Sequence, residues 1–409
     1  MSKFHIRSTS HTYAEFLKKL DGWIRDDLPR LNEAVETGSV SPTDFVACVQ
    51  SWINEAYSSF AKQPFDRPMA FRLIQLLGFL VSSAEKHFQD RKAEPGTGLA
   101  LLNPADELLV ALAQIACHPP RDTQYTYWKQ NNVASPLTFT GSNQEVFFNY
   151  AVNQTDEFHT ASCIGLRQVC NGYVDVISND AIEVINQATQ NMKALHKIYG
   201  SFMTKNEDGQ QNLDPMFFMK RMRTYLPAYP VKGVMWDGVN AANTTSQMQV
   251  DYLIGTVNAD YFGVVEKRLR YLVPEDQLAL KADIQLPSLF NQILQVLKLT
   301  VADVDEWNSD LLGMYLIAQP PSVRNVLVAY RNLVSEAGGL SAMHWALIKN
   351  YLIKPAAKMT EAEKAHMAVN PDGGTGKAKH SDTEKIMRMR HDHPTIGKFL
   401  TALKGGQYL

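Results

Sequence analysis

Apolar residues recur at helical spacing along most of the chain. Segments 12–28, 68–88, 180–203 and 322–340 place apolar side chains three or four positions apart, whereas runs that alternate every second residue are short and scarce. Helix starts are also marked. The strings "SPTDF" and "NPADE" put a capping side chain and a proline before an acidic first turn, and "TVADVDEW" is similar. The pattern predicts an all-α protein.

Two regions interrupt this helical rhythm. The first, 117–147, is rich in proline, aromatic and polar residues and follows a helical first third. We therefore expect a boundary near residue 140, between a small N-terminal helical domain (1–140) and a larger C-terminal one (141–409). The second, 358–393, is highly charged and carries a glycine cluster. A polar stretch this long is usually a functional loop or a disordered one.

Composition narrows the class of partner. The chain has 409 residues, 40 Lys+Arg against 42 Asp+Glu. This near-neutral balance argues against nucleic acid or an anionic membrane surface. The N-terminus has no apolar core and no apolar run is long enough to span a bilayer, so we expect neither a secretion signal nor a membrane helix. Four cysteines without a C-x-x-C pair fit a reducing cytoplasm. The oligomeric state is left open.

One histidine lies inside an apolar helical pattern, "LSAMHWALIKNYLIKPA". Helical spacing puts His344 on the same face as Leu340, Leu347 and Ile348. Such a ring is either a core histidine, satisfied by backbone or water, or a metal or haem ligand on an apolar wall. Taken alone, this helix favours the core histidine.

A resemblance over a longer stretch of the chain favours the interpretation of His344 as a haem ligand. The block "VRNVLVAYRNLVSEAGGLSAMHWALIKNYLIKPA" followed by "GGTG" resembles the C-terminal signature of the indoleamine 2,3-dioxygenase family. Three more blocks agree in order: "DPMFFMKRMRTYLPAY" with "GVMWDGV", "NAANTTSQMQVDYLIG", and "PP" followed by "W" and "SPLTF". The string "PPRDT" is also similar to the divergent branch that includes monodechloroaminopyrrolnitrin synthase, which rearranges chlorinated tryptophan. The resemblance implies a helical fold, haem b, O2, and tryptophan or a related indole as substrate.

The resemblance also implies which residues bind the cofactor. His344 matches the proximal haem ligand, and Asn171 falls where the family has a small polar residue on the distal side, a choice that one residue of slip would change. The glycine loop, with Gly374, Thr375 and Gly376, matches the segment that closes over the pocket. Without the resemblance, the loop would pass for a flexible linker.

The substrate residues implied by the resemblance lie in "DPMFFMKRMRTYLPAY". Arg223 falls where the family binds the substrate carboxylate, a task that suits a planar guanidinium. It shares a helical stripe with Met219 and Leu226, so it interrupts an apolar face. The alternative is a solvated arginine in the basic run "KRMR". Phe218 matches a pocket aromatic, and Met219 stands where the family has a second aromatic ring.

The leading functional hypothesis is a haem-dependent dioxygenase acting on tryptophan or a related indole. Such chemistry is supplied by the cofactor and needs no acidic or nucleophilic side chain, so no catalytic residue is assigned. Two alternatives stay open: another haem-dependent transformation of a tryptophan derivative, and a haem-binding protein without turnover. The cluster His391, Asp392 and His393 could bind a transition metal, but histidines in a charged tail are more often solvated.

Overall fold

The computed structural model describes residues 9–62, 64–205, 209–239, 244–365, 367, 369, 380–391 and 393–405. Regular structure within them is helical apart from one antiparallel hairpin, in which β1 (Tyr229–Val231) pairs with β2 (Val234–Trp236). The predicted all-α fold class is therefore confirmed.

The chain folds into two compact units, each assembled from separate stretches of sequence. Unit 1 comprises residues 1–153, 205–243 and 349–380, and unit 2 comprises residues 154–204, 244–348 and 381–409. The two helical domains expected from the sequence, 1–140 and 141–409, stay a prediction.

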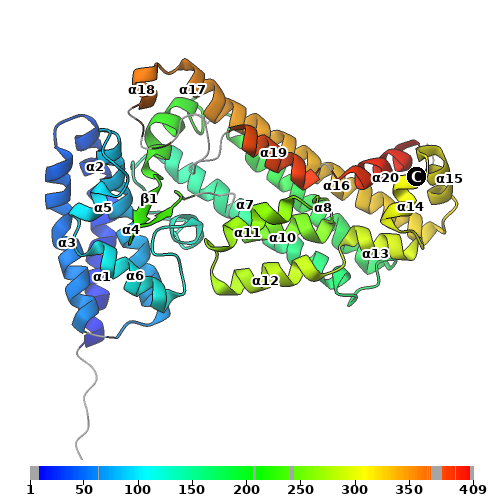
Figure 1. Ribbon diagram of the computed structural model, residues 1–409, viewed down its shortest axis with the longest axis horizontal. Coiled ribbons are helices and arrows are strands. Elements are labelled where there is room, and N and C mark those ends of the chain that lie inside the picture. Colours follow the sequence, from blue (N-terminus) through cyan, green and yellow to red (C-terminus); the bar gives the residue numbers. More distant parts are fainter. Residues whose placement is uncertain are drawn as a thin grey trace, which may run out of the picture. The chain divides into compact units, whose positions relative to one another are not determined.

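A central helix organises unit 1. Within α4 (Arg67–Gln89), every residue from Ala70 to His87 is buried except the half-buried Arg72. A helix this apolar needs cover on all sides, and α1 (Thr9–Asp26), α2 (Leu28–Glu36), α3 (Pro42–Lys62), α5 (Thr97–Leu101) and α6 (Ala105–Ala116) supply it (Figure 1). The remaining helical segments of unit 1 are η1 (Tyr125–Lys129), α9 (Pro215–Phe217), η2 (Phe218–Met222), η3 (Arg223–Tyr225), η5 (Lys349–Ile353), α17 (Lys354–Lys358) and α18 (Glu361–Ala365).

Buried polar contacts hold the irregular segment after α6. The Arg121 guanidinium donates to the Asp122 carboxylate at 2.8 Å and lies over the Tyr229 ring at 4.1 Å. The Tyr229 hydroxyl donates to the same carboxylate at 2.9 Å. The "PPRDT" string therefore has a structural role, because it ties this segment to the hairpin.

A single carboxylate fixes the next turn of the chain. Glu145, in α7 (Asn143–Cys170), is fully buried and accepts four hydrogen bonds. The donors are the Tyr127 hydroxyl at 2.6 Å, the Phe139 N–H at 2.9 Å, and the N–H and hydroxyl of Thr140 at 2.8 and 2.6 Å. These bonds hold η1 and the "PLTF" segment against α7.

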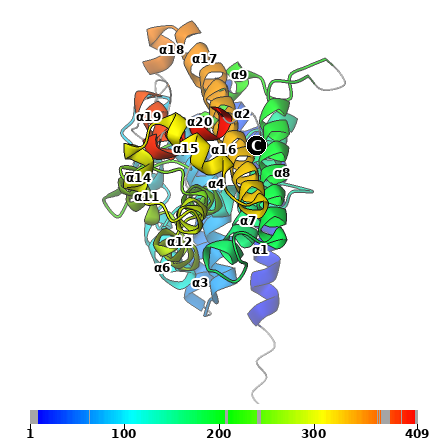
Figure 2. The same ribbon diagram turned by 90° about the vertical axis from the view of Figure 1, so that its right-hand side faces the viewer.

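Two long helices form the centre of unit 2. α8 (Asn179–Ser201) and α16 (Pro321–Ile348) pack along each other, as Figure 2 shows. Their shared core includes the thiols of Cys163 and Cys170, both free, which agrees with core packing rather than redox chemistry. The other helices of unit 2 are α10 (Thr245–Ile254), α11 (Tyr261–Leu269), α12 (Pro274–Gln285), α13 (Leu289–Val296), α14 (Val301–Glu306), α15 (Ser309–Ile317), α19 (His380–His391) and α20 (Pro394–Gly405).

A buried ion pair joins α10 to α19 inside unit 2. Arg390 donates to Asp251 through two parallel bonds, Nε to Oδ2 at 2.6 Å and Nη2 to Oδ1 at 2.9 Å. The Tyr261 hydroxyl adds a third bond to this carboxylate at 3.0 Å. Two well-aligned bonds and a satisfied acceptor are what a buried pair needs to offset its desolvation.

Two of the three helix starts marked in the sequence have the predicted cap. At "NPADE" the prediction is wrong, because Pro104 is the residue before α6 and no side chain caps this helix. Ser41 accepts the Asp44 N–H at 3.1 Å where α3 begins, and Thr300 and Asp303 cap each other at the start of α14. Across the described residues, every helix is too short or too polar to cross a bilayer.

Replacing Arg390 with leucine should strongly destabilise the protein, because the Asp251 carboxylate would stay buried without its guanidinium. Removing one partner of a buried pair costs about 3 to 5 kcal/mol. Arg388, on the same helix, is the control: its side chain is 68% exposed beside Glu384, so Arg388→Leu should cost less than about 1 kcal/mol. Urea unfolding measures both variants, and equal losses would show that the buried pair is worth no more than a surface contact.

Candidate functional site

His344 lies near the C-terminal end of α16, in unit 2. The preceding turns of this helix are buried on a regular face, but residues 343–347 are all half-buried. The Nδ1 atom of His344 is buried, and among the described residues it has no hydrogen-bond partner. Its ring lies 5.7 Å from that of Tyr199 on α8, centroid to centroid. A buried imidazole nitrogen without a partner is unusual in a plain core histidine.

The surroundings of His344 keep it neutral. Burial, and after it the charge of Arg390, lower the pKa of His344 to about 4. A neutral imidazole is the form that binds a metal, and half-buried apolar neighbours suit a flat apolar cofactor. The residues present therefore fit a haem ligand. The Nδ1 atoms of His159 and His393 are also buried with no partner among the described residues, so this feature alone does not separate a haem ligand from a core histidine.

A second buried histidine of unit 2 was given no role from the sequence. His159 on α7 is 2% exposed, and burial followed by the charge of Arg390 lowers its pKa to about 4. Arg390 thus influences both histidines from one position. Helical spacing could have found His159, because it shares a buried stripe with Cys163, Leu166 and Cys170.

Asn171 lies in a different setting from the one expected. It is exposed and follows the last residue of α7, where its N–H donates to the Arg167 carbonyl at 2.9 Å. Gly172 comes next with φ of +74°, so the two residues form a helix C-terminus. The distal role of Asn171 stays a prediction from the resemblance alone.

Several other expected residues lie outside the described part of the chain. This applies to Gly374, Thr375 and Gly376, to Asp392, and to the side chain of His391. His393 is described, half-buried, with its ring 6.5 Å from that of Phe290. Where the structure describes the chain, no three histidine, cysteine or carboxylate side chains gather as a metal site.

Arg223 lies in unit 1 and is buried, with 2% of its surface exposed. The interpretation as a solvated arginine is therefore wrong. Its Nη1 lies 3.4 Å from the Met219 sulfur, and burial lowers the pKa of the guanidinium to about 10. The side chain is thus charged at neutral pH in an environment that disfavours charge, which is the setting in which a ligand carboxylate binds well.

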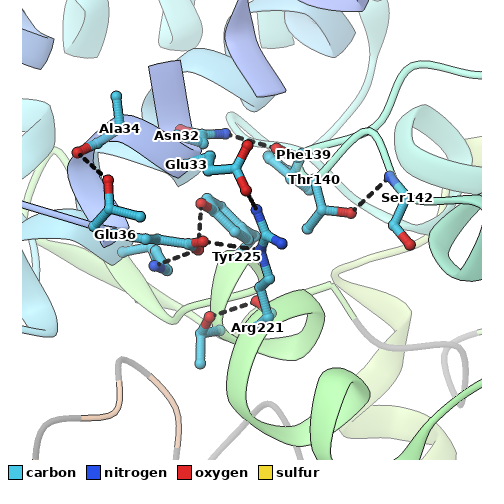
Figure 3. Close-up of polar contacts among 12 residues, drawn as sticks. Asn32, Glu33, Ala34, Glu36, Phe139, Thr140, Ser142, Arg221 and Tyr225 are labelled. Atoms are coloured by element: carbon cyan, nitrogen blue, oxygen red, sulfur yellow. Dashed lines mark hydrogen bonds and ion pairs between the residues drawn. The ribbon is translucent and has the colours of Figure 1, made fainter. Parts of the chain in front are cut away.

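Arg221, two residues earlier, has a different role. Its guanidinium pairs with Glu36 at 2.9 Å and Glu33 at 3.4 Å, both on α2, as Figure 3 shows. The Tyr225 hydroxyl donates to the same Glu36 carboxylate at 2.7 Å. Arg221 therefore anchors this segment to α2.

Aromatic side chains from three π-helical turns of unit 1 form one connected cluster. We call it the aromatic cluster: Trp128 on η1, Phe148 on α7, Phe218 on η2 and Tyr351 on η5. Ring centroids lie 5.9 Å apart for Trp128 and Phe148, 5.4 Å for Phe148 and Phe218, and 5.9 Å for Phe218 and Tyr351. π-Helical turns are rare and often mark functional sites. Sequence periodicity did not predict them.

Met219 is not a member of this chain of rings. It is fully buried against Ala356 and Met359, with Met216 and Met367 packed on the same group. Phe218 and Met219, adjacent in sequence, thus serve two different clusters of unit 1, and only Phe218 joins the aromatic one.

Comparison with known families places the chain in a family. A family model, monodechloroaminopyrrolnitrin synthase PrnB, matches residues 52–318, which is more than half of the chain. The protein belongs to this family. The PrnB family is haem-dependent and related to indoleamine 2,3-dioxygenase, so the resemblance seen in the sequence is confirmed, as are haem and oxidative chemistry at the level of the family. The chain matches no curated protein. The matched range contains Arg223 and most of the aromatic cluster, and it ends before α16.

Stability should fall as the pH drops from about 6.5 to 4, through the buried His118. This ring bonds the Pro119 carbonyl and the Thr123 hydroxyl, both at 2.8 Å, and burial lowers its pKa from 6.5 to about 4. Between pH 6.5 and 4, the His118 ring binds a proton in the unfolded chain but not in the folded one. The stability that is present above pH 6.5 is therefore lost as the pH falls towards 4.

Thermal unfolding against pH checks this expectation. His118→Asn keeps a donor near Nδ1 but does not titrate. It should make the acid limb of the curve less steep, although His159 and His344 still contribute in the same pH window. His196→Asn, at a half-exposed histidine of unit 2, is the control and should leave the curve's shape unchanged. An unchanged acid limb in His118→Asn would contradict the assignment.

Proposed function

We propose that the protein is a haem b enzyme that oxidatively transforms tryptophan or a related indole amino acid, with His344 as the iron ligand. The observation that supports this most directly is the neutral, half-buried imidazole of His344, whose buried Nδ1 has no partner among the described residues, in a chain of a haem-dependent family. When bound, a haem with one neutral histidine ligand supplies the binding and activation of O2.

The side chains of unit 1 would bind and orient the substrate. The planar guanidinium of the buried Arg223 suits a carboxylate, and the aromatic cluster offers ring faces and edges to an indole. Neither group exchanges a proton with the substrate in this proposal. Their contribution is to position the indole and exclude water, and both are effective only if held rigidly. The buried bonds of Glu145 and Asp122 provide that rigidity for the surrounding segments.

Two oxidative outcomes are compatible with these residues. We favour insertion of oxygen into the indole, as in the dioxygenases that the sequence resembles. The alternative is a rearrangement of a tryptophan derivative, as the name of the matched family indicates. Incubation of the haem-loaded protein with tryptophan and isotopically labelled O2, followed by mass spectrometry, separates them: dioxygenation places both labelled atoms in the product, and rearrangement leaves the retained skeleton without them.

His344→Ala should abolish the absorption spectrum of a histidine-ligated haem. The substitution removes the ligand without adding bulk, so the protein should stay folded by circular dichroism. His196→Ala is the matched control, because His196 is a half-buried histidine of the same unit that bonds the Glu336 carbonyl at 3.0 Å. If His344→Ala keeps the ferrous carbon monoxide spectrum of the wild type, iron is held elsewhere.

Arg223→Leu should weaken binding of L-tryptophan by about 2 to 3 kcal/mol, the value of a charge-assisted bond to a carboxylate. Haem binding should be unaffected. Indole, which lacks the carboxylate, should bind the wild type and the variant alike.

Arg221→Leu is the control for this experiment, since its guanidinium pairs with Glu33 and Glu36. It should lower stability but leave tryptophan affinity unchanged. Equal titrations of L-tryptophan into the wild type and Arg223→Leu would leave Arg223 as a structural residue.

A further inference from the structure

Two polar side chains beside the aromatic cluster are buried but lack normal hydrogen bonds. Trp128 and Asn149 are each 2% exposed. Among the described residues, the Trp128 Nε1 and both amide atoms of Asn149 have no hydrogen-bond partner. The Asn149 amide does lie close enough to the Tyr127 hydroxyl to lower its pKa, against the larger effect of burial, without a bond of normal geometry. Buried polar groups are almost always paired, so both require an explanation.

Tyr127 lies beside both side chains: its ring centroid is 5.3 Å from that of Trp128, and its hydroxyl is close to the Asn149 amide. Phe148 precedes Asn149 in α7 and lies 5.9 Å from the Trp128 ring. Phe148 and Phe218 are only half-buried although they are apolar. Unpaired polar atoms beside partly exposed aromatic rings are the usual composition of a site that binds a small planar molecule.

We propose that Trp128 and Asn149 form a polar subsite that selects planar heteroaromatic ligands with a ring N–H. The Asn149 Oδ1 accepts the ring N–H, and the Trp128 Nε1–H donates to an acceptor oxygen on the same ligand. The aromatic cluster packs against the ring. This inference rests on the proposed function, because it names the groups that would distinguish an indole from other aromatic amino acids.

The polar groups of such a subsite lower the stability of the free protein but strengthen its binding of the ligand. In the free protein, unpaired buried groups are destabilising, so replacing them with apolar groups of similar shape should leave stability equal or higher. In the complex the same groups are paired, so their removal should weaken binding. A purely structural role would give the reverse result: lower stability and unchanged affinity.

The experiment uses Asn149→Leu, which nearly keeps the size of the side chain, and Trp128→Phe, which removes the Nε1–H together with part of the buried ring. Calorimetric titration with L-tryptophan should show a dissociation constant raised about tenfold for each, the equivalent of one lost hydrogen bond. The unfolding temperature of Asn149→Leu should equal or exceed that of the wild type, and it is the variant that tests stability, because Trp128→Phe also carries the cost of a small cavity. An L-tryptophan analogue methylated on the ring nitrogen should bind the wild type and Asn149→Leu equally, because neither can then use the ring N–H.

Tyr13→Phe is the matched control. Its hydroxyl is also buried with no partner among the described residues, but its ring packs on Phe16 and Phe65, on other elements of unit 1. The variant should keep or gain stability and bind L-tryptophan like the wild type.

The subsite and the proposed function fail in different ways. Wild-type affinity in both variants, or lower stability with unchanged affinity, would overturn the subsite. Absence of a haem spectrum in the wild type would overturn the proposed function. Titration of the variants with L-tryptophan would still test whether Trp128 and Asn149 bind the ligand. A wild type that binds haem but neither tryptophan nor its methylated analogue would overturn the subsite as well.

Discussion

Every buried nitrogen or oxygen atom needs a hydrogen-bond partner, and this requirement determines the interior of both units. In unit 1 the Glu145 carboxylate collects four donors, and this single side chain fixes η1 and the segment that follows it. In unit 2 Asp251 takes two bonds from Arg390 and one from Tyr261. A carboxylate left unpaired in either position would cost more than most single apolar contacts provide. The irregular segments of the fold are ordered because these charges are satisfied.

A buried polar atom without a partner indicates a functional site only when a second observation supports it. The hydroxyls of Tyr13 and Thr256 are also buried with no partner among the described residues, so an unpaired atom does not by itself indicate a site. His344 is different because it lies on a partly covered stretch of α16 in a chain of a haem-dependent family. Trp128 is different because its ring belongs to a cluster assembled from three π-helical turns. Both candidate sites therefore combine a buried polar atom that has no partner among the described residues with an unusual feature of the local structure.

Helical periodicity predicted the all-α class, the caps of α3 and α14, and the apolar face that carries His344, because each of these depends on residues within a few positions of one another. It missed the π-helical turns, which insert one residue per turn and so shift the faces that simple spacing predicts. The effect of the Arg390 charge on His159 was also beyond reach, since the two residues are distant in sequence. Asn171 was placed by counting residues along one helix, and the exposed end of α7 lies there.

Two buried arginines show how the protein can favour a charged ligand. Burial lowers the pKa of Arg223 to about 10. At Arg390, burial acts in the same direction, but the Asp251 carboxylate outweighs it and raises the pKa overall. The two guanidinium groups thus differ in what the surrounding chain contributes to their charged form. A ligand carboxylate beside Arg223 would add the kind of stabilisation that Asp251 gives Arg390, and that gain would appear only on binding. Selection for amino-acid ligands over free indole would then follow from the electrostatics of one side chain, independently of how the ring is recognised.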